Sequence, residues 1–146
     1  MNVYFDTSCL GRPFDDQSIS RNANEREAIL TMLEMVERGE LTLTISDFVS
    51  DEIADTPDEL RRQQLQDVAA LSTTVVAATD KIRDRGAELQ RLGLKPFDAL
   101  HIAAAESARV DRLCTADDRL KRRAARQLDL KVRVVSILEL FLELKQ

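Results

Sequence analysis

Four acidic residues, Asp6, Glu52, Asp98 and Asp117, stand where strand-like runs end or helix-like segments begin. Carboxylates gathered in a partly buried cleft repel one another, and each is costly to desolvate unless a positive charge compensates. Ligands that are all oxygen favour Mg²⁺ or Mn²⁺, and such an ion activates water and stabilises charge on a phosphate. The set therefore predicts a metal site that hydrolyses phosphodiester bonds, with all four acids as ligands and catalytic groups.

Two of these positions have acidic neighbours that compete for the role. Asp51 could replace Glu52, but the longer side chain of Glu52 suits a ligand that reaches back from the second turn of a helix. Asp118 follows Thr115 by three residues, as a helix-capping acid would, so we predict a structural role for Asp118 and a metal-binding role for Asp117. Taken alone, an Asp after a strand more often forms a turn or a cap, and it is the set of four that favours a site.

Other polar residues lie close to these acids in the sequence. Thr7, Ser8 and Thr115 are adjacent to or near the predicted ligands and are expected to orient them or a bound water. His101, the single histidine, lies one turn after Asp98. No partner for it is visible in the sequence, so packing or hydrogen bonding within its helix is favoured over a role as general base.

A basic run follows the last acid, with Arg126 just beyond it. Two interpretations are equally supported: a solvated helix face, or a surface that contacts RNA phosphates. The second assigns RNA binding to Arg119, Lys121, Arg122 and Arg123.

The elements that must position these groups alternate along the chain. Apolar or β-branched runs predict strands at residues 3–5, 41–45, 73–77, 112–115 and 131–135. Periodic apolar residues and capping signals predict helices at residues 24–38, after 46–47, from 56–59, around 82–92, at 96–108 and after a capping box at 136–139. Residues 11–17 are predicted to form a polar loop in which Asp15 and Asp16 are solvated.

This alternation predicts an α/β fold, a three-layer α/β/α sandwich with a central parallel sheet of about five strands. In such a fold the carboxyl ends of strands and the amino ends of helices share one edge of the sheet, where ligands bind. Side chains on a helix lean toward its amino end, so all four acids are expected to reach that edge.

Composition limits the other possibilities. The 146 residues fit one domain, 1–146, and the net charge of −5 argues against a protein that coats nucleic acid through bulk positive charge. Cys9 and Cys114 lack metal-ligand spacing, which favours two free thiols. No signal peptide or membrane-spanning run is visible, so a cytoplasmic protein is expected.

Four segments together resemble a PIN domain, the ribonuclease fold used by VapC-type toxins of bacterial toxin–antitoxin pairs. The segments are 3–8, 46–52, 96–103 and 115–120, in the order of the family, and the one around Asp98 is the most specific. The resemblance implies a Rossmann-like sandwich, cleavage of single-stranded RNA with Mg²⁺ or Mn²⁺, a homodimer and a small antitoxin that blocks the cleft. It places the acidic positions of the family on Asp6, Glu52, Asp98 and Asp117, while Ser8 stands where many relatives have Asn.

Two other classes compete with a nuclease. One is a PIN-like domain that binds RNA or a protein without cutting, although such a domain has no reason to keep four repelling carboxylates. The other is a phosphoryl-transfer domain. A dehalogenase-type phosphatase needs an acid where Ser8 stands, and a receiver needs a lysine near its last strand, where Lys131 fits poorly.

Overall fold

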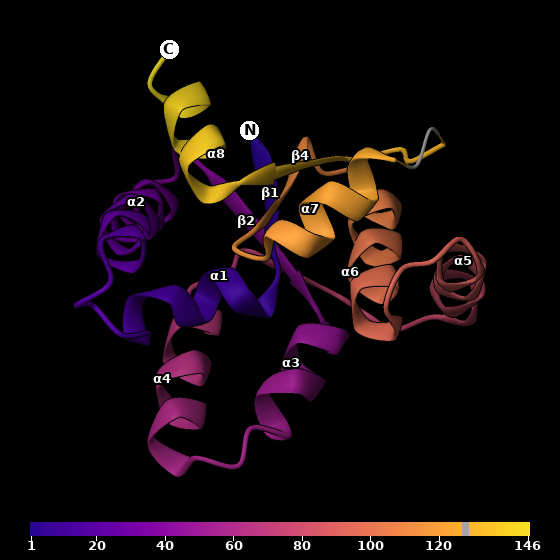
Figure 1. Cartoon of the computed structure of the whole chain (residues 1–146), viewed down its shortest axis with the longest axis horizontal. Coiled ribbons are helices and arrows are strands. Elements are labelled where there is room, and N and C mark those ends of the chain that lie inside the picture. The colour runs from indigo at the N-terminus through magenta and orange to yellow at the C-terminus, as the bar shows by residue number, and fades with distance from the viewer. Residues whose placement is uncertain (127–128) are drawn as a thin grey trace.

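A central sheet of five parallel strands organises the chain in the computed structural model, which describes residues 1–126 and 129–146 (Figure 1). The strands are β1 (Asn2–Phe5), β2 (Thr42–Ser46), β3 (Thr74–Val76), β4 (Arg112–Thr115) and β5 (Arg133–Ser136). Their order across the sheet is β3-β2-β1-β4-β5. The predicted α/β fold with about five parallel strands is confirmed.

Helices connect the strands and cover both faces of the sheet. They are α1 (Thr7–Gly11), the 3₁₀ turn η1 (Arg12–Phe14), α2 (Ser20–Glu37), α3 (Asp47–Ala54), α4 (Glu59–Ala69), α5 (Asp80–Arg91), α6 (Pro96–Ser107), α7 (Asp118–Ala125) and α8 (Ile137–Leu144). In Figure 1, α2 and α8 lie on one side of the strands, and α5 and α6 lie on the other.

The centre of the sheet is β1, whose last three residues have no exposed surface. It pairs with β2 on one side and with β4 on the other, so that Tyr4 lies between Thr44 and Leu113. A strand buried on both faces reads as a continuous apolar run, as Val3 to Phe5 do. This burial fixes the position of Asp6, the next residue.

The direction of the chain across the sheet reverses between β1 and β4. From β1 the chain proceeds outward through β2 to β3, and it then returns to the other side of β1 to form β4 and β5. Ligands of open α/β sheets bind at the carboxyl ends of the strands at such a reversal. Asp6 and Thr115 stand at this point, at the ends of β1 and β4.

The prediction of a polar loop at residues 11–17 is wrong for residues 11–14, which are helical. The chain turns directly from β1 into α1 and then into η1. Asp6 caps α1, because its side chain accepts a hydrogen bond from the backbone N–H of Cys9. Pro13, in the first turn of η1, has the φ that a helical turn requires.

Two helix starts also differ from the prediction. Helix α2 begins at Ser20, four residues before its predicted start at residue 24, because its first turn is polar and carries no apolar signal. Helix α4 begins at Glu59 and is capped by Asp58, not by Thr56. The hydroxyl of Thr56 instead donates to the carbonyl of Glu52, near the end of α3.

Several local predictions are confirmed. Ser136 and Glu139 form the capping box at the start of α8. Gly39, just beyond α2, adopts a φ of 75°, and Gly93, beyond α5, adopts 106°, conformations that side-chain-bearing residues rarely take. Cys9 and Cys114 are buried free thiols.

No helix within residues 1–126 and 129–146 combines the length and the hydropathy needed to cross a bilayer.

Candidate active site

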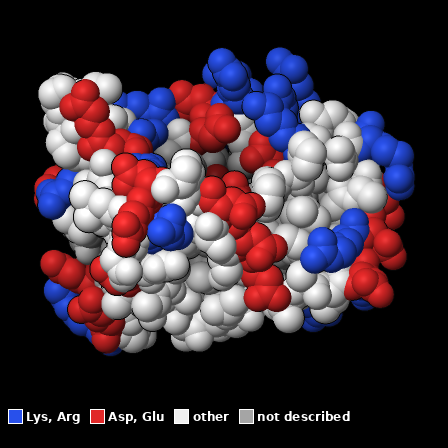
Figure 2. Space-filling model, turned by 90° about the horizontal axis from the view of Figure 1, so that it is seen from below, with Lys and Arg blue, Asp and Glu red and all other residues white. Residues whose placement is uncertain are grey.

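All four predicted acids lie at or near the edge of the sheet where the strands end. Seen from the side on which α3 and α4 lie, Asp and Glu side chains gather in the middle of the face beside a hollow, and Lys and Arg side chains lie along one rim (Figure 2). The acids come from four places: the residue after β1, the second turn of α3, the first turn of α6 and the residue before α7.

Asp6 is the most deeply placed of the four, with 5% of its surface exposed. One carboxylate oxygen, Oδ1, accepts from the hydroxyl of Ser8 at 2.6 Å and from the backbone N–H of Cys9 at 3.1 Å. The other, Oδ2, accepts from the hydroxyl of Thr115 at 2.5 Å. Burial raises the pKa of Asp6, and the charge of His101 and these hydrogen bonds offset part of the rise.

The hydroxyls of Ser8 and Thr115 do more than bind Asp6. Ser8 Oγ also accepts from the backbone N–H of Ala116 at 2.9 Å, and Thr115 Oγ1 accepts from the N–H of Asp117 at 3.0 Å. Each hydroxyl thus links the carboxylate of Asp6 to the loop that carries Asp117. The structure places both hydroxyls against Asp6, and their role in orienting a metal ligand stays a prediction.

Glu52 is held by two donors that share one of its oxygens. Oε1 accepts from Thr7 Oγ1 at 2.7 Å and lies 2.5 Å from His101 Nε2, whereas Oε2 has no hydrogen-bond partner within the described residues. Burial favours a higher pKa for Glu52, but the hydrogen bonds and charge of His101 outweigh it, and the pKa falls below its usual value. Asp51 is exposed, so of the two neighbours it is Glu52 that contacts Thr7 and His101.

Asp98 is half-buried in the first turn of α6, and its carboxylate has no hydrogen bond or ion pair within the part of the chain that the structure describes. Its pKa is raised to about 6, first by burial and then by the negative charges of Asp117, Asp6 and Glu52. The other three acids therefore act on Asp98 through space.

Asp117 is the N-cap of α7. Its Oδ1 accepts from the backbone N–H of Arg119 at 2.8 Å and of Leu120 at 3.4 Å, and its Oδ2 has no partner within the described residues. The prediction that Asp118 caps this helix is wrong. Asp118 instead binds the guanidinium of Arg21 through two hydrogen bonds, at 2.7 and 2.9 Å.

His101 is buried and bonded to residues of other elements. Its Nδ1 lies 2.7 Å from the hydroxyl of Tyr4, and Tyr4 also lies 2.6 Å from the hydroxyl of Ser46. His101 is packed in the interior, which was one of the two predicted alternatives, but its hydrogen bonds run to Tyr4 of β1 and Glu52 of α3 and not to its own helix. Sequence reasoning also missed Tyr4, although a tyrosine in a fully buried strand needs a partner for its hydroxyl, and this was a usable signal. Burial raises the pKa of Tyr4 and keeps the hydroxyl protonated.

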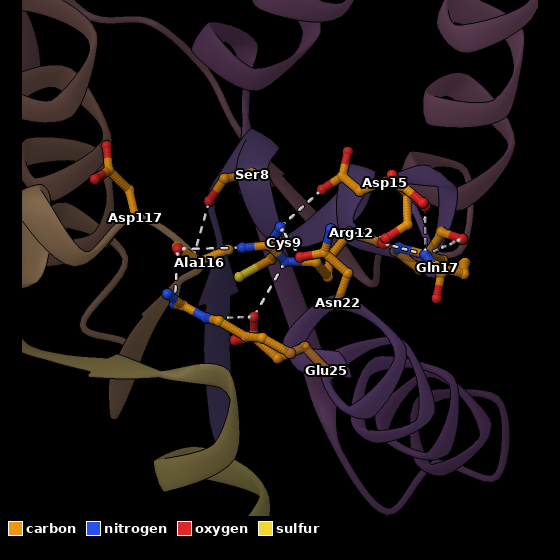
Figure 3. A network of polar contacts seen from close by, with 12 residues as sticks. Ser8, Cys9, Arg12, Asp15, Gln17, Asn22, Glu25, Ala116 and Asp117 are labelled. Carbon is orange, nitrogen blue, oxygen red and sulfur yellow. Dashed lines mark hydrogen bonds and ion pairs between the residues drawn. The ribbon is translucent and has the colours of Figure 1, made fainter. Parts of the chain in front are cut away.

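The side chain of Arg12 connects η1, α2 and the loop between β4 and α7, which contains Ala116 (Figure 3). Its guanidinium donates to Asn22 at 2.7 Å and to the carbonyl of Ala116 at 3.4 Å, and it forms ion pairs with Asp15 and the buried Glu25. The pattern around residues 11–17 gave no sign of this role.

Arg21 and Arg61 extend this network. Arg21 donates to the same Ala116 carbonyl at 3.2 Å. Asp15, predicted to be solvated, is instead paired with Arg12 and Arg61.

The basic run after Asp117 forms most of α7. Arg119 and Arg122 are exposed, Arg123 is half-buried, and Lys121 forms an ion pair with Glu139 of α8. The structure therefore leaves Arg119 and Arg122 as the most accessible cations of this run.

The chemistry of the donor set fits a hard divalent cation. The acids supply oxygen ligands only, and Glu52, Asp98 and Asp117 each have a carboxylate oxygen without a hydrogen bond within the described residues. The distances between the acids are still too long for this: in the described ranges, no three acidic, His or Cys side chains stand at the separation of metal ligands.

Comparison with known families identifies the fold. A model of the PIN domain matches residues 3–126. The chain belongs to the PIN domain family. This match confirms the predicted family. PIN domains are generally nucleases and typically use divalent metals.

Solved structures share the PIN fold at low sequence identity. VapBC2 from Rickettsia felis, bound to a DNA fragment from its promoter, has a TM-score of 0.61 and 17% identity over 93% of this chain and 98% of that one. A toxin–antitoxin complex from Klebsiella pneumoniae has a TM-score of 0.62 and 20% identity, with 92% and 97% covered. A protein from Pyrobaculum aerophilum has a TM-score of 0.56 and 15% identity, with 99% and 96% covered. No curated protein matches the sequence.

Proposed function

We propose that this PIN domain is a metal-dependent endoribonuclease that hydrolyses RNA phosphodiester bonds with Asp6, Glu52, Asp98 and Asp117. The observation that carries the proposal is the state of Asp98. Its half-buried carboxylate has no partner of its own within the described residues, and burial, together with the charges of the three other acids, raises its pKa to about 6. Such an arrangement is unfavourable without a cation and becomes favourable when one binds.

Each acid has a distinct part in holding Mg²⁺ or Mn²⁺. Asp6 is fixed by three hydrogen bonds and provides the rigid base of the site. Glu52 and Asp117 are each anchored through one oxygen and present the other, and Asp98 presents both. A bound divalent cation supplies Lewis acidity toward a phosphate oxygen and lowers the pKa of a water ligand. Because the carboxylates are not yet at ligand spacing, binding must draw them together.

The RNA backbone would be bound beside the acids by the cations of α7. Arg119 and Arg122 are exposed and are the best placed to meet phosphates. Lys121 is paired with Glu139 and Arg123 is half-buried, so both would contribute less.

The biological role we propose is the toxin of a toxin–antitoxin pair, acting in the cytoplasm as a homodimer and blocked by a small antitoxin. Support comes from the family and from the similar structures, one of which is described as a toxin–antitoxin complex and another as VapBC2. Co-expression with the product of an adjacent small reading frame, followed by co-purification, tests the partner.

Cleavage of a panel of structured and single-stranded RNAs tests the activity. The wild-type protein with Mn²⁺ should cut, the same protein in EDTA should not, and Asp98→Asn should lose cleavage. Asp51→Asn removes an exposed carboxylate one residue from Glu52 and should cut like the wild type. Equal survival of RNA with the wild type and with Asp98→Asn in Mn²⁺ contradicts the proposal.

One observation favours a second function, a PIN-like module that binds RNA or a protein without cutting. No three acidic, His or Cys side chains of the described residues are preassembled at ligand spacing. This module would bind the RNA panel equally well in Mn²⁺ and in EDTA and leave every RNA intact.

A further inference from the structure

A chain of side chains connects the buried sheet to the candidate site. Ser46 at the end of β2 contacts Tyr4 of β1, Tyr4 contacts His101 of α6, and His101 contacts Glu52 of α3, with separations of 2.6, 2.7 and 2.5 Å. Tyr4 has no exposed surface and His101 has 2%. The four residues come from four elements, so the chain exists only in the assembled fold.

The chemistry of the groups sets the direction of each hydrogen bond in this chain. An ionised carboxylate only accepts, so His101 Nε2 must carry the hydrogen that Glu52 Oε1 receives. In a neutral imidazole Nδ1 is then the acceptor, and the hydroxyl of Tyr4 must donate to it. The oxygen of Tyr4 is left to accept from the hydroxyl of Ser46.

The two hydrogen-bond donors of Glu52 determine which of its carboxylate oxygens is left for other contacts. His101 and Thr7 both bind Oε1, so the carboxylate is held from one side and Oε2 is left without a hydrogen bond within the described residues. Without the hydroxyl of Tyr4, the buried Nδ1 would have no donor, so the tautomer with hydrogen on Nε2 would lose one of its two stabilising contacts.

We propose that Tyr4, acting through His101, is a positioning residue that stabilises, together with Glu52, the Nε2–H tautomer and the ring orientation of the imidazole and so helps to orient Glu52 in the site. This inference rests on the proposed function for its effect on cleavage, but the tautomer itself can be measured without metal or RNA. Partners that orient a ligand typically contribute about 10- to 100-fold to metal affinity or activity.

The amino-acid composition allows spectroscopy to observe Tyr4 and His101 without interference from other residues. The sequence has one histidine, one tyrosine and no tryptophan. All imidazole nitrogen signals in an NMR spectrum therefore come from His101, and all tyrosine fluorescence comes from Tyr4. In metal-free wild-type protein at pH 8, ¹⁵N shifts should show hydrogen on Nε2 and a bare Nδ1. Mg²⁺ should then shift these imidazole signals.

Tyr4→Phe removes the hydroxyl and keeps the ring. It should leave Nδ1 without a donor, which shifts the Nδ1 ¹⁵N signal and holds the ring less firmly, and it should lower Mn²⁺ affinity and kcat by about 10- to 100-fold, with a smaller change in KM for RNA. The matched control is Thr44→Val, which removes a buried hydroxyl of β2 that bonds Asn2 outside the network and should leave all of these values unchanged.

His101→Gln supplies an amide N–H to Glu52 that needs no tautomer. Adding Tyr4→Phe to it should cost much less than Tyr4→Phe costs alone, a non-additivity expected of residues that act in series. This comparison keeps the test valid if Tyr4→Phe is less stable.

Two results would overturn the inference while leaving the nuclease intact: hydrogen on Nδ1 in the wild type, or a Tyr4→Phe protein that cuts like Thr44→Val. A wild-type protein that shows the predicted tautomer, but neither binds Mg²⁺ nor cuts RNA, would instead refute the proposed function and with it any catalytic effect of Tyr4.

Discussion

Asp98 differs from the other acids in having no hydrogen bond within the described residues to offset its burial. Its pKa is about 6 in the folded protein, above the value near 3.8 of an unperturbed Asp. The folded state therefore holds this proton more tightly than the unfolded state does. The resulting contribution to stability is complete below pH 3.8 and is lost as the pH rises through 6.

This sign predicts that Asp98→Asn is stabilising when metal is absent. Asparagine is neutral at every pH, so in EDTA at pH 8 the variant should melt at a higher temperature than the wild type, and the difference should shrink toward pH 4. Thermal melts at several pH values measure it. A variant that melts lower than the wild type at pH 8 would contradict the raised pKa.

Glu52 and Asp51 offer a second comparison at the level of single residues. Glu52→Gln keeps the shape of a side chain that contacts Thr7 and His101, but it removes the charge. We expect cleavage to fall by about 100-fold or more, beyond what loss of a ligand's partner costs. Asp51→Asn, one position away and exposed, should change the rate little. Similar losses in both variants would point to general electrostatics instead of a ligand at Glu52.

At the level of elements, Arg12 connects η1, α2 and the loop between β4 and α7. Its side chain is 15% exposed and faces Glu25, which is 2% exposed. Arg12→Ala leaves that buried carboxylate with Arg21 as its one ion-pair partner among the described residues and removes the bonds to Asn22 and Ala116. Breaking such a buried pair typically costs about 3 kcal/mol.

Urea titration measures this cost as a shift of the midpoint at unchanged slope. Arg61→Ala is the control, because Arg61 is 40% exposed and, in the part of the chain that the structure describes, forms an ion pair with Asp15 alone, so its loss should cost less than about 1 kcal/mol. Equal midpoints for the two variants would show that the Arg12 network contributes no more than a surface pair.

The elements themselves were largely predictable, because strands such as β1 and helices such as α6 carry strong local patterns. Asp6 and Asp98 could be chosen from the sequence since a strand end and a helix start place them at one edge. Their hydrogen-bond partners could not. Arg12 contacts Ala116 and Tyr4 contacts His101 across about a hundred positions, and no local period records such pairs.

The capping of α7 by Asp117 instead of Asp118 has a similar cause. Both stand at the start of α7 and either could cap it by sequence alone. Arg21, on α2, binds Asp118 and leaves Asp117 as the cap.

The single domain over 1–146 stays a prediction.

For the whole molecule, a cation that binds only the folded state must stabilise it. At a hundredfold excess of Mn²⁺ over its Kd the gain is about 2.7 kcal/mol. For a chain of this size that corresponds to a rise in Tm of about 5 to 10 °C. Differential scanning fluorimetry with and without Mn²⁺ tests this, and Asp98→Asn should lose most of the rise. An equal rise in both proteins would place the cation elsewhere.

The pairing of β1 with β4 also bears on how the chain is made. The bond between Thr115 and Asp6 spans 109 positions, and the bond between Ser8 and Ala116, in the loop that carries Asp117, spans 108. Synthesis proceeds from the amino end, so a ribosome exposes Asp6 and Glu52 long before it exposes Asp117. On the proposed function, a growing polypeptide cannot cut the message that encodes it until β4 has emerged and joined the sheet.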